Sequence, residues 1–162
     1  MAQELKTVDH VDLELYTGTW YEQASIPMIF QNSACVGTTA HYTLNPDQSI
    51  KVWNQCYIPH QQGYTLDRIE GRAFVADTSS NAKLKVSFGG PFAGDYWIIA
   101  LDTAYSYALV GHPSRNYLWL LTREPVVAEE QIQMMLKLAQ DQGYDLKRVK
   151  RTLGIRQKRS FK

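Results

Sequence analysis

Short segments of alternating apolar and polar residues extend along the chain as far as residue 124. Alternation of this kind predicts β-strands that turn one face toward a core. Glycine, proline, asparagine, aspartate and serine separate the segments, as in "NPDQS" and "GGPFAG", and these residue types are typical of turns. We therefore predict eight antiparallel strands in chain order, an opening strand within 16–26 followed by 35–44, 50–57, 68–77, 82–88, 95–102, 105–111 and 116–124.

The period of the pattern changes after Pro125. Apolar residues then recur at the spacing of one helix face, two glutamates stand in the first turn, and Gly143 follows the last apolar position. This pattern predicts one amphipathic helix, and a short last strand is expected around 146–152. The residues of the apolar face are Ala128, Ile132, Met135, Leu136 and Ala139.

Eight up-and-down strands and one late helix predict an all-β fold. The architecture we expect is an eight-stranded up-and-down antiparallel β-barrel with one C-terminal α-helix packed outside it. Closure removes the exposed edges of a sheet, and a barrel of eight strands has room for side chains and one small ligand. We divide the chain into an N-terminal extension (1–10), the barrel with its helix (11–154) and a basic C-terminal tail (155–162).

Charge is distributed unevenly around a net value of +1. Residues 147–162 hold eight lysines and arginines and no acid, whereas the rest of the chain holds nine bases and sixteen acids. A basic segment of this kind is typical of a solvated tail or of contact with anionic lipid headgroups. The body is acidic and the basic residues do not alternate with aromatics, and both features argue against nucleic-acid binding. The N-terminus lacks the apolar core of a signal peptide.

The first predicted strand places an acid beside a tryptophan. Alternation assigns Trp20, Glu22 and Ala24 to one face of this strand and the residues between them to the other. If that face is the interior, Glu22 is a buried carboxyl group that requires a hydrogen bond, a partner or a proton. Glu22 is then either a satisfied structural acid or a polar contact for a ligand.

Cys35 and Cys56 match neither a C-x-x-C motif nor a zinc-binding set. Segments 35–44 and 50–57 form a predicted hairpin, and a register in which residue 44 opposes residue 50 brings the cysteines within a few residues of each other. Two free buried thiols are the alternative. We predict the disulfide, and no metal site, and hence an oxidising compartment.

Three stretches resemble the lipocalin family over roughly Val11 to Thr152, in particular bacterial outer-membrane lipocalins, plant temperature-induced lipocalins and apolipoprotein D. "GTWYE" resembles the G-x-W motif of the first strand and supplies Gly18 and Trp20. "LVGHPSRNYLWLLTRE" resembles the last-strand motif and supplies Arg123. "LDTAY" retains Asp102 of the middle motif but has threonine where the family has tyrosine.

The resemblance implies roles for these residues. Trp20 would plug the closed end of the barrel, with Arg123 across its ring, and these two residues with Gly18 and Asp102 would be structural. Loops at the open mouth would add two apolar side chains. The ligand-binding residues implied are Glu22, Tyr42, Asn54, Tyr96 and Trp119 inside the barrel and Phe30 and Phe92 on the mouth loops.

The function expected from this resemblance is binding and transport of a small hydrophobic ligand, a fatty acid or lysophospholipid, with its head near the mouth. We expect no catalysis and no cofactor, since no catalytic motif matches. A haem or pigment carrier using His60 or His112, and a lipid- or peroxide-processing enzyme using Glu22 or Cys35, are the alternatives. We expect a monomer or weak homodimer that contacts a membrane peripherally, in the periplasm or at the outer membrane after removal of a signal or lipoprotein anchor, with the cytoplasm as the alternative.

Overall fold

The structure, a computed structural model, describes residues 3–27, 34–89 and 93–154. Two α-helices and a 3-10 helix accompany a single sheet: α1 (Leu13–Tyr16), α2 (Glu129–Asp141) and η1 (Leu146–Arg148). The strands are β1 (Gly18–Ile26), β2 (Val36–Leu44), β3 (Ile50–His60), β4 (Gly63–Val75), β5 (Lys83–Ser87), β6 (Gly94–Leu101), β7 (Tyr107–Gly111), β8 (Leu118–Thr122) and β9 (Lys150–Arg151).

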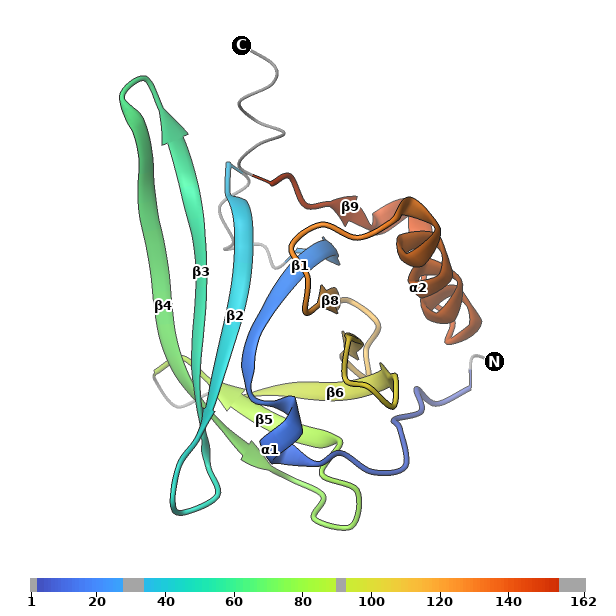
Figure 1. Ribbon diagram of the computed structural model, residues 1–162. Helices are drawn as coiled ribbons and strands as arrows, with labels where there is room; N and C mark the ends of the chain where they lie inside the picture. The colour runs from blue at the N-terminus through green and yellow to red at the C-terminus, as the bar shows by residue number, and fades with distance from the viewer. Residues whose placement is uncertain (1–2, 28–33, 90–92, 155–162) are drawn as a thin grey trace.

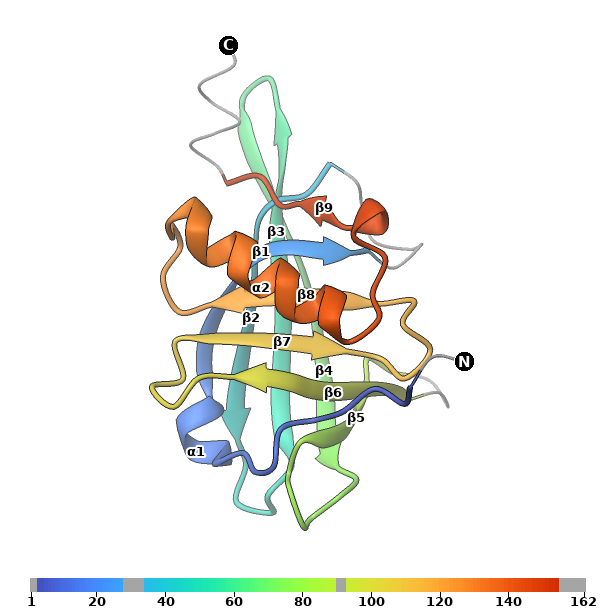
Figure 2. The same ribbon diagram turned by 90° about the vertical axis from the view of Figure 1, so that its right-hand side faces the viewer.

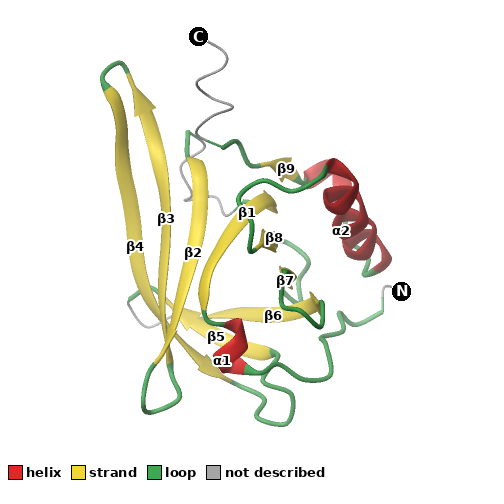
Figure 3. Cartoon of the chain, viewed as in Figure 1, coloured by secondary structure: helices red, strands yellow, loops and turns green. Residues whose placement is uncertain are grey.

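The first eight strands form a closed antiparallel meander. Each strand from β1 to β7 pairs with the next in the chain, and β8 pairs with β1 (Figures 1 and 3). Leu44 pairs with Ile50, which is the hairpin register predicted from the sequence. The predicted eight-stranded up-and-down barrel is therefore confirmed.

The hairpin of β3 and β4 is longer than the sequence pattern predicts and projects beyond the neighbouring strands (Figure 1). The pattern ends the first of these strands at residue 57, and Pro59 beyond it has no amide hydrogen for a ladder. Pairing nevertheless continues to His60 and Gly63. The turn is possible because Gly63 adopts a φ of +134°, which a side chain would strain.

A β-bulge in β1 corrects one prediction about the interior. Glu22 pairs with Leu121, but the next pair is Ala24 with Leu120, so Gln23 is an additional residue on the β1 side. Alternation predicts Ala24 on the same face as Glu22. The bulge instead turns Ala24 outward, where it packs with Leu120 beneath α2.

Two groups of buried apolar side chains lie on opposite sides of the barrel wall. The outer cluster lies beneath α2, which covers the outside of the barrel as predicted (Figure 2). It comprises Leu5, Ala24, Ile26, Ile99, Leu109, Leu118, Leu120, Ile132, Met135, Ala139 and Tyr144. The inner cluster fills the closed end and comprises Val11, Tyr16, Trp20, Ala40, Tyr42, Ile50, Val52, Ala73, Ala82, Leu84, Ile98, Ala108, Val110 and Leu121.

The segment before β1 packs against the barrel. Leu5 is buried in the outer cluster, and the Val11 amide donates to the carbonyl of Ser80 at 2.8 Å. The Asp12 carboxylate accepts hydrogen bonds from amides of the first turn of α1, which makes it the N-cap of this helix. These contacts set the position from which the chain enters β1.

Residues 150–153, here called the closing segment, complete the barrel wall. β2 pairs only with the first part of β1, Gly18–Tyr21. The second part of β1 pairs on one side with β8 and on the other with β9 (Figure 2). The amide of Gly37 at the start of β2 then donates to the carbonyl of Leu153 at 2.7 Å. The closing segment thus lies between β1 and β2 where these strands separate.

Candidate functional site

Trp20 and Arg123 close one end of the barrel. Trp20 is fully buried, and the guanidinium carbon of Arg123 lies 3.8 Å from the centre of its ring, a cation–π contact. Gly18 has a φ of +104°, and a Cβ there would lie 3.2 Å from the guanidinium. Arg123 also donates to three backbone carbonyls, those of Leu15 (2.7 Å), Thr19 (3.0 Å) and Tyr105 (3.2 Å).

Three tyrosine hydroxyls meet above this plug. The Tyr96 hydroxyl lies 2.7 Å from that of Tyr16 and 2.8 Å from that of Tyr42. We call these three residues the tyrosine cluster. The sequence singled out Tyr42 and Tyr96 but missed Tyr16, which ends α1 and is the first residue of the range predicted for the opening strand. Its local signal is its position two residues before Gly18 of the G-x-W stretch.

The inward face of the wall remains partly accessible to solvent above the cluster. Asn54 pairs with Ala40 of the inner cluster and is half-buried. Trp119 pairs with Ser25 and packs against the inner cluster, and it too is half-buried, although its neighbours in β8 are fully buried. These two inward positions are therefore less closely packed than two of the three tyrosines of the cluster.

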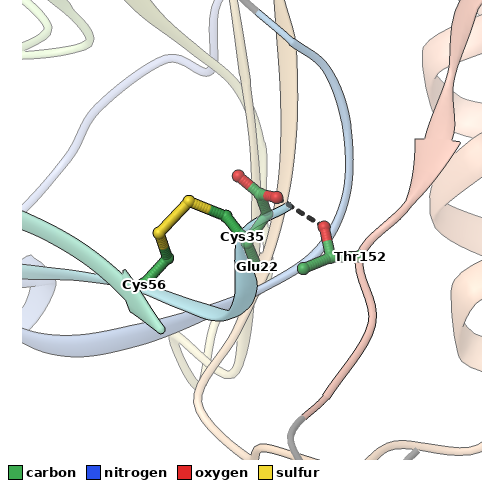
Figure 4. The surroundings of a disulfide bond; sticks show 4 residues. All are labelled: Glu22, Cys35, Cys56 and Thr152. Atoms are coloured by element: carbon green, nitrogen blue, oxygen red, sulfur yellow. Dashed lines mark hydrogen bonds between the residues drawn. A yellow bond between two sulfur atoms is a disulfide. The ribbon is translucent and has the colours of Figure 1, made fainter. Parts of the chain in front are cut away.

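Glu22 is a buried acid at the level of the closing segment. The Thr152 hydroxyl donates to its carboxylate (Figure 4), and Ser25 adds a second side-chain hydrogen bond. Burial raises the pKa of Glu22 to about 7, although both hydrogen bonds act in the opposite direction. The sequence missed Ser25, which the bulge turns inward, and Thr152, which only the tertiary fold brings to β1.

Cys35 and Cys56 form the predicted disulfide (Figure 4), with their Cα atoms 5.4 Å apart. The bond joins the chain just before β2 to β3. In the described residues, one group of possible metal-ligating atoms comes together, that of the two sulfurs with the Asp67 carboxylate, all within 4.8 Å. The sulfurs are bonded to each other and are therefore not available as thiolate ligands.

Purified protein is expected to carry this disulfide and to lack free thiols. Its intact mass before reduction should fall short of the reduced mass by two hydrogen atoms. Iodoacetamide should modify Cys35 and Cys56 only after treatment with a reductant. Alkylation of either cysteine in unreduced protein unfolded in urea would contradict the assignment, and a Cys35→Ser variant under the same conditions, in which Cys56 has no partner, serves as the positive control.

Asp102 organises the turn between β6 and β7. Its carboxylate accepts from the amides of Ser106 (2.6 Å) and Tyr107 (3.0 Å) and from the Ser106 hydroxyl. The threonine that follows Asp102 takes no part in these bonds. Asp102 therefore lies in a turn and makes local contacts.

The two histidines considered for a haem or pigment have local partners. His60 accepts a hydrogen bond from the Gln62 amide at 3.3 Å and lies exposed at the end of β3. His112 shares a hydrogen bond of 2.8 Å with Ser114 and lies 3.9 Å from Asp95. These contacts do not indicate a ligand for either ring.

Phe30 and Phe92, predicted on the mouth loops, lie outside the described residues. Between residues 3 and 154, in the parts that the structure describes, no helix is long and apolar enough to cross a membrane.

Comparisons with known proteins agree with this geometry. Residues 11–153 match the sequence model of a family described as a lipocalin-like domain. Temperature-induced lipocalin-1 of Arabidopsis thaliana is 40% identical, with coverage of 93% of this chain and 83% of the relative. Outer membrane lipoprotein Blc of Escherichia coli K12 is also 40% identical, with coverage of 86% and 77%.

Proteins with lower sequence identity also match this chain. Apolipoprotein D of Rattus norvegicus is 32% identical, with coverage of 87% of this chain and 76% of the relative. Among solved structures, insecticyanin of Manduca sexta superposes with a TM-score of 0.71 at 18% identity, with coverage of 94% and 85%. At that identity the superposition shows a shared fold.

Proposed function

The chain belongs to the lipocalin-like domain family, and from this premise we propose that it binds and carries a small hydrophobic molecule inside the barrel. The ligand class we propose is a fatty acid or lysophospholipid, bound at about one molecule per barrel. The proposed ligand contacts are Glu22, Tyr42, Asn54, Tyr96 and Trp119.

The partly accessible inner face is the observation that carries this proposal. Asn54, Tyr96 and Trp119 lie on inward positions of three different strands, and each is half-buried. A filled core would bury all three. Aromatic side chains with polar tips suit a ligand that has a long apolar body and a polar end. Affinity would come from apolar surface removed from water, at about 25 cal/mol per Å².

We propose binding, and not turnover, as the role of the site. Cys35, a candidate nucleophile in the enzyme alternative, has its sulfur in the disulfide. Glu22, the other candidate, is hydrogen-bonded by Thr152 and Ser25. The disulfide also supports an oxidising compartment, the periplasm or the outer membrane, for which the name of the Blc relative is a parallel.

Two half-buried tryptophans provide the test. Trp119 packs against the inner cluster, whereas Trp97 packs against the outer cluster with Lys83 over its ring at 4.3 Å. Trp119→Ala is expected to weaken binding of a dansyl-labelled fatty acid about tenfold or more, because an aromatic wall contact is lost. Trp97→Ala should leave the dissociation constant within about twofold.

Native mass spectrometry should in addition show about one fatty acid or lysophospholipid per chain. Equal weakening by Trp119→Ala and Trp97→Ala would place the ligand elsewhere than inside the barrel. A wild-type protein that takes up neither the labelled fatty acid nor a lysophospholipid would refute the proposed function.

A further inference from the structure

The tyrosine cluster is a closed set of hydrogen-bonding groups. Tyr96 is its centre, since its hydroxyl contacts both of the others, at 2.7 and 2.8 Å. Among the residues that the structure describes, the hydroxyls of Tyr16 and Tyr42 have no hydrogen-bond partner other than Tyr96. The cluster therefore holds three hydroxyl groups but only two contacts between them.

All three hydroxyls keep their protons. Burial raises the pKa of Tyr42 to about 12, and it raises the pKa values of Tyr16 and Tyr96 well above the usual value for a tyrosine. Each hydroxyl thus supplies one proton and each contact uses one. In every arrangement of the three groups, one O–H is left without an acceptor inside the cluster.

The burial of the remaining O–H group favours binding of a hydrogen-bond acceptor next to it. Tyr16 and Tyr42 are only 3% and 6% exposed, and a buried donor without an acceptor loses the hydration it had in water. Tyr96, the centre of the cluster, is half-buried and stands on an inward position of β6.

The positive charge of Arg123, which lies below the cluster, also favours an acceptor oxygen there. Arg123 makes its polar contacts with backbone carbonyls, and no carboxylate of the described residues forms an ion pair with it. At Tyr16 burial and Tyr42 raise the pKa, whereas the hydrogen bond with Tyr96 and the positive charge of Arg123 lower it. The positive charge of Arg123 is therefore felt at Tyr16, where it favours an oxygen with partial negative charge, while Glu22 acts in the opposite direction at Tyr42.

We propose that the tyrosine cluster is the subsite for the polar end of the ligand, where its spare O–H donates to a carbonyl or carboxylate oxygen. This inference rests on the proposed function and reverses the orientation expected from the sequence, in which the head lies near the mouth. It selects molecules with an apolar body and a terminal acceptor, such as fatty acids, fatty esters and long-chain ketones. An alkane leaves the donor unsatisfied.

Replacing a single tyrosine of the cluster with phenylalanine does not remove the spare O–H donor. Tyr42→Phe leaves two hydroxyls and one contact, so one O–H is still spare. Only the triple variant, with Tyr16, Tyr42 and Tyr96 all replaced by phenylalanine, removes the donor entirely. The matched control lies outside the site: Tyr107→Phe also removes one tyrosine hydroxyl, but Tyr107 packs against the outer cluster.

The experiment compares methyl nonyl ketone with dodecane, which has the same number of heavy atoms, by displacement of a dansyl-labelled fatty acid. The quantity compared is the dissociation constant of the ketone divided by that of dodecane. This ratio is expected to be about fivefold to tenfold higher in the triple variant than in wild type, because the ketone loses one neutral hydrogen bond. The Tyr107→Phe variant should retain the wild-type ratio. Taking ratios cancels the difference in water solubility of the ligands.

A second measurement on the wild-type chain avoids dependence on the folding of the variant. With tyrosine labelled with carbon-13 at Cζ, the ketone should shift the resonances of Tyr16, Tyr42 and Tyr96, and dodecane should shift them much less. If both ligands bind but these resonances and the ratio of dissociation constants do not change, the inference is wrong and the proposed function stands. If neither ligand nor the labelled fatty acid binds, the proposed function itself fails.

Discussion

Replacing Glu22 with glutamine is expected to stabilise the protein by about 3 kcal/mol at about pH 8, and by less than about 1 kcal/mol at about pH 5. The cause is the pKa of Glu22, which burial raises from 4.5 to about 7. An amide retains an acceptor for Thr152 and carries no charge at any pH. The gain therefore measures the free-energy cost of ionising Glu22 inside the barrel.

The direction follows from proton binding in the two states. Below pH 4.5 the carboxyl is protonated in both the folded and the unfolded chain, and it contributes no pH dependence. Between 4.5 and about 7 the unfolded chain releases this proton while the folded chain keeps it, so stability falls as pH rises. Above about 7 both states are ionised and the loss is complete.

Urea denaturation of wild type and Glu22→Gln at several pH values checks this expectation. Glu130→Gln is the control, because Glu130 is an exposed glutamate of α2 and its replacement should change stability by less than about 0.5 kcal/mol at either pH. A Glu22→Gln variant that is no more stable than wild type at about pH 8 would mean that Glu22 is ionised at little cost.

The second large effect is expected for Trp20→Ala, which should destabilise the protein by about 4 kcal/mol. Trp20 is fully buried in the inner cluster, so the substitution removes a large packed ring and leaves a cavity. It also takes away the surface over which Arg123 lies at 3.8 Å. The guanidinium keeps its three carbonyl acceptors, so the loss comes mainly from packing.

Chemical denaturation followed by far-ultraviolet circular dichroism measures this loss without relying on tryptophan fluorescence. Trp97→Ala again provides the comparison, since Trp97 is a half-buried tryptophan on the outer face, and its removal should cost about half as much or less. Equal losses for the two variants would show that Trp20 does not plug the barrel in the way its burial indicates.

Strand order, register and the outer helix could be predicted because they depend on local patterns. Alternation, turn residues and the change of period at Pro125 were sufficient for these features, and the pairing of Leu44 with Ile50 followed from the length of one turn. The bulge at Gln23 could not be predicted in this way. The bulge has no signal in the residues of β1 and is defined only by the pairing of β1 with β8. Its effect is to move Ala24 outward.

Some residues of the candidate site could be predicted from the sequence and others could not. The resemblance to lipocalins singled out Tyr42 and Tyr96, and their hydroxyls meet in the structure. Their partner Tyr16 belongs to a four-residue helix that no periodicity reveals. Thr152 reaches Glu22 only through a contact across 130 positions of sequence, which no local pattern encodes.

The closing segment has a consequence for a chain shortened at its C-terminal end. A chain truncated after residue 149 would keep all eight barrel strands but would lose Lys150–Arg151 and Thr152. The second part of β1 would then lack the backbone pairing that β9 supplies, and Glu22 would lack the hydroxyl of Thr152. The last few described residues of the chain therefore decide whether the barrel wall is continuous between β1 and β2.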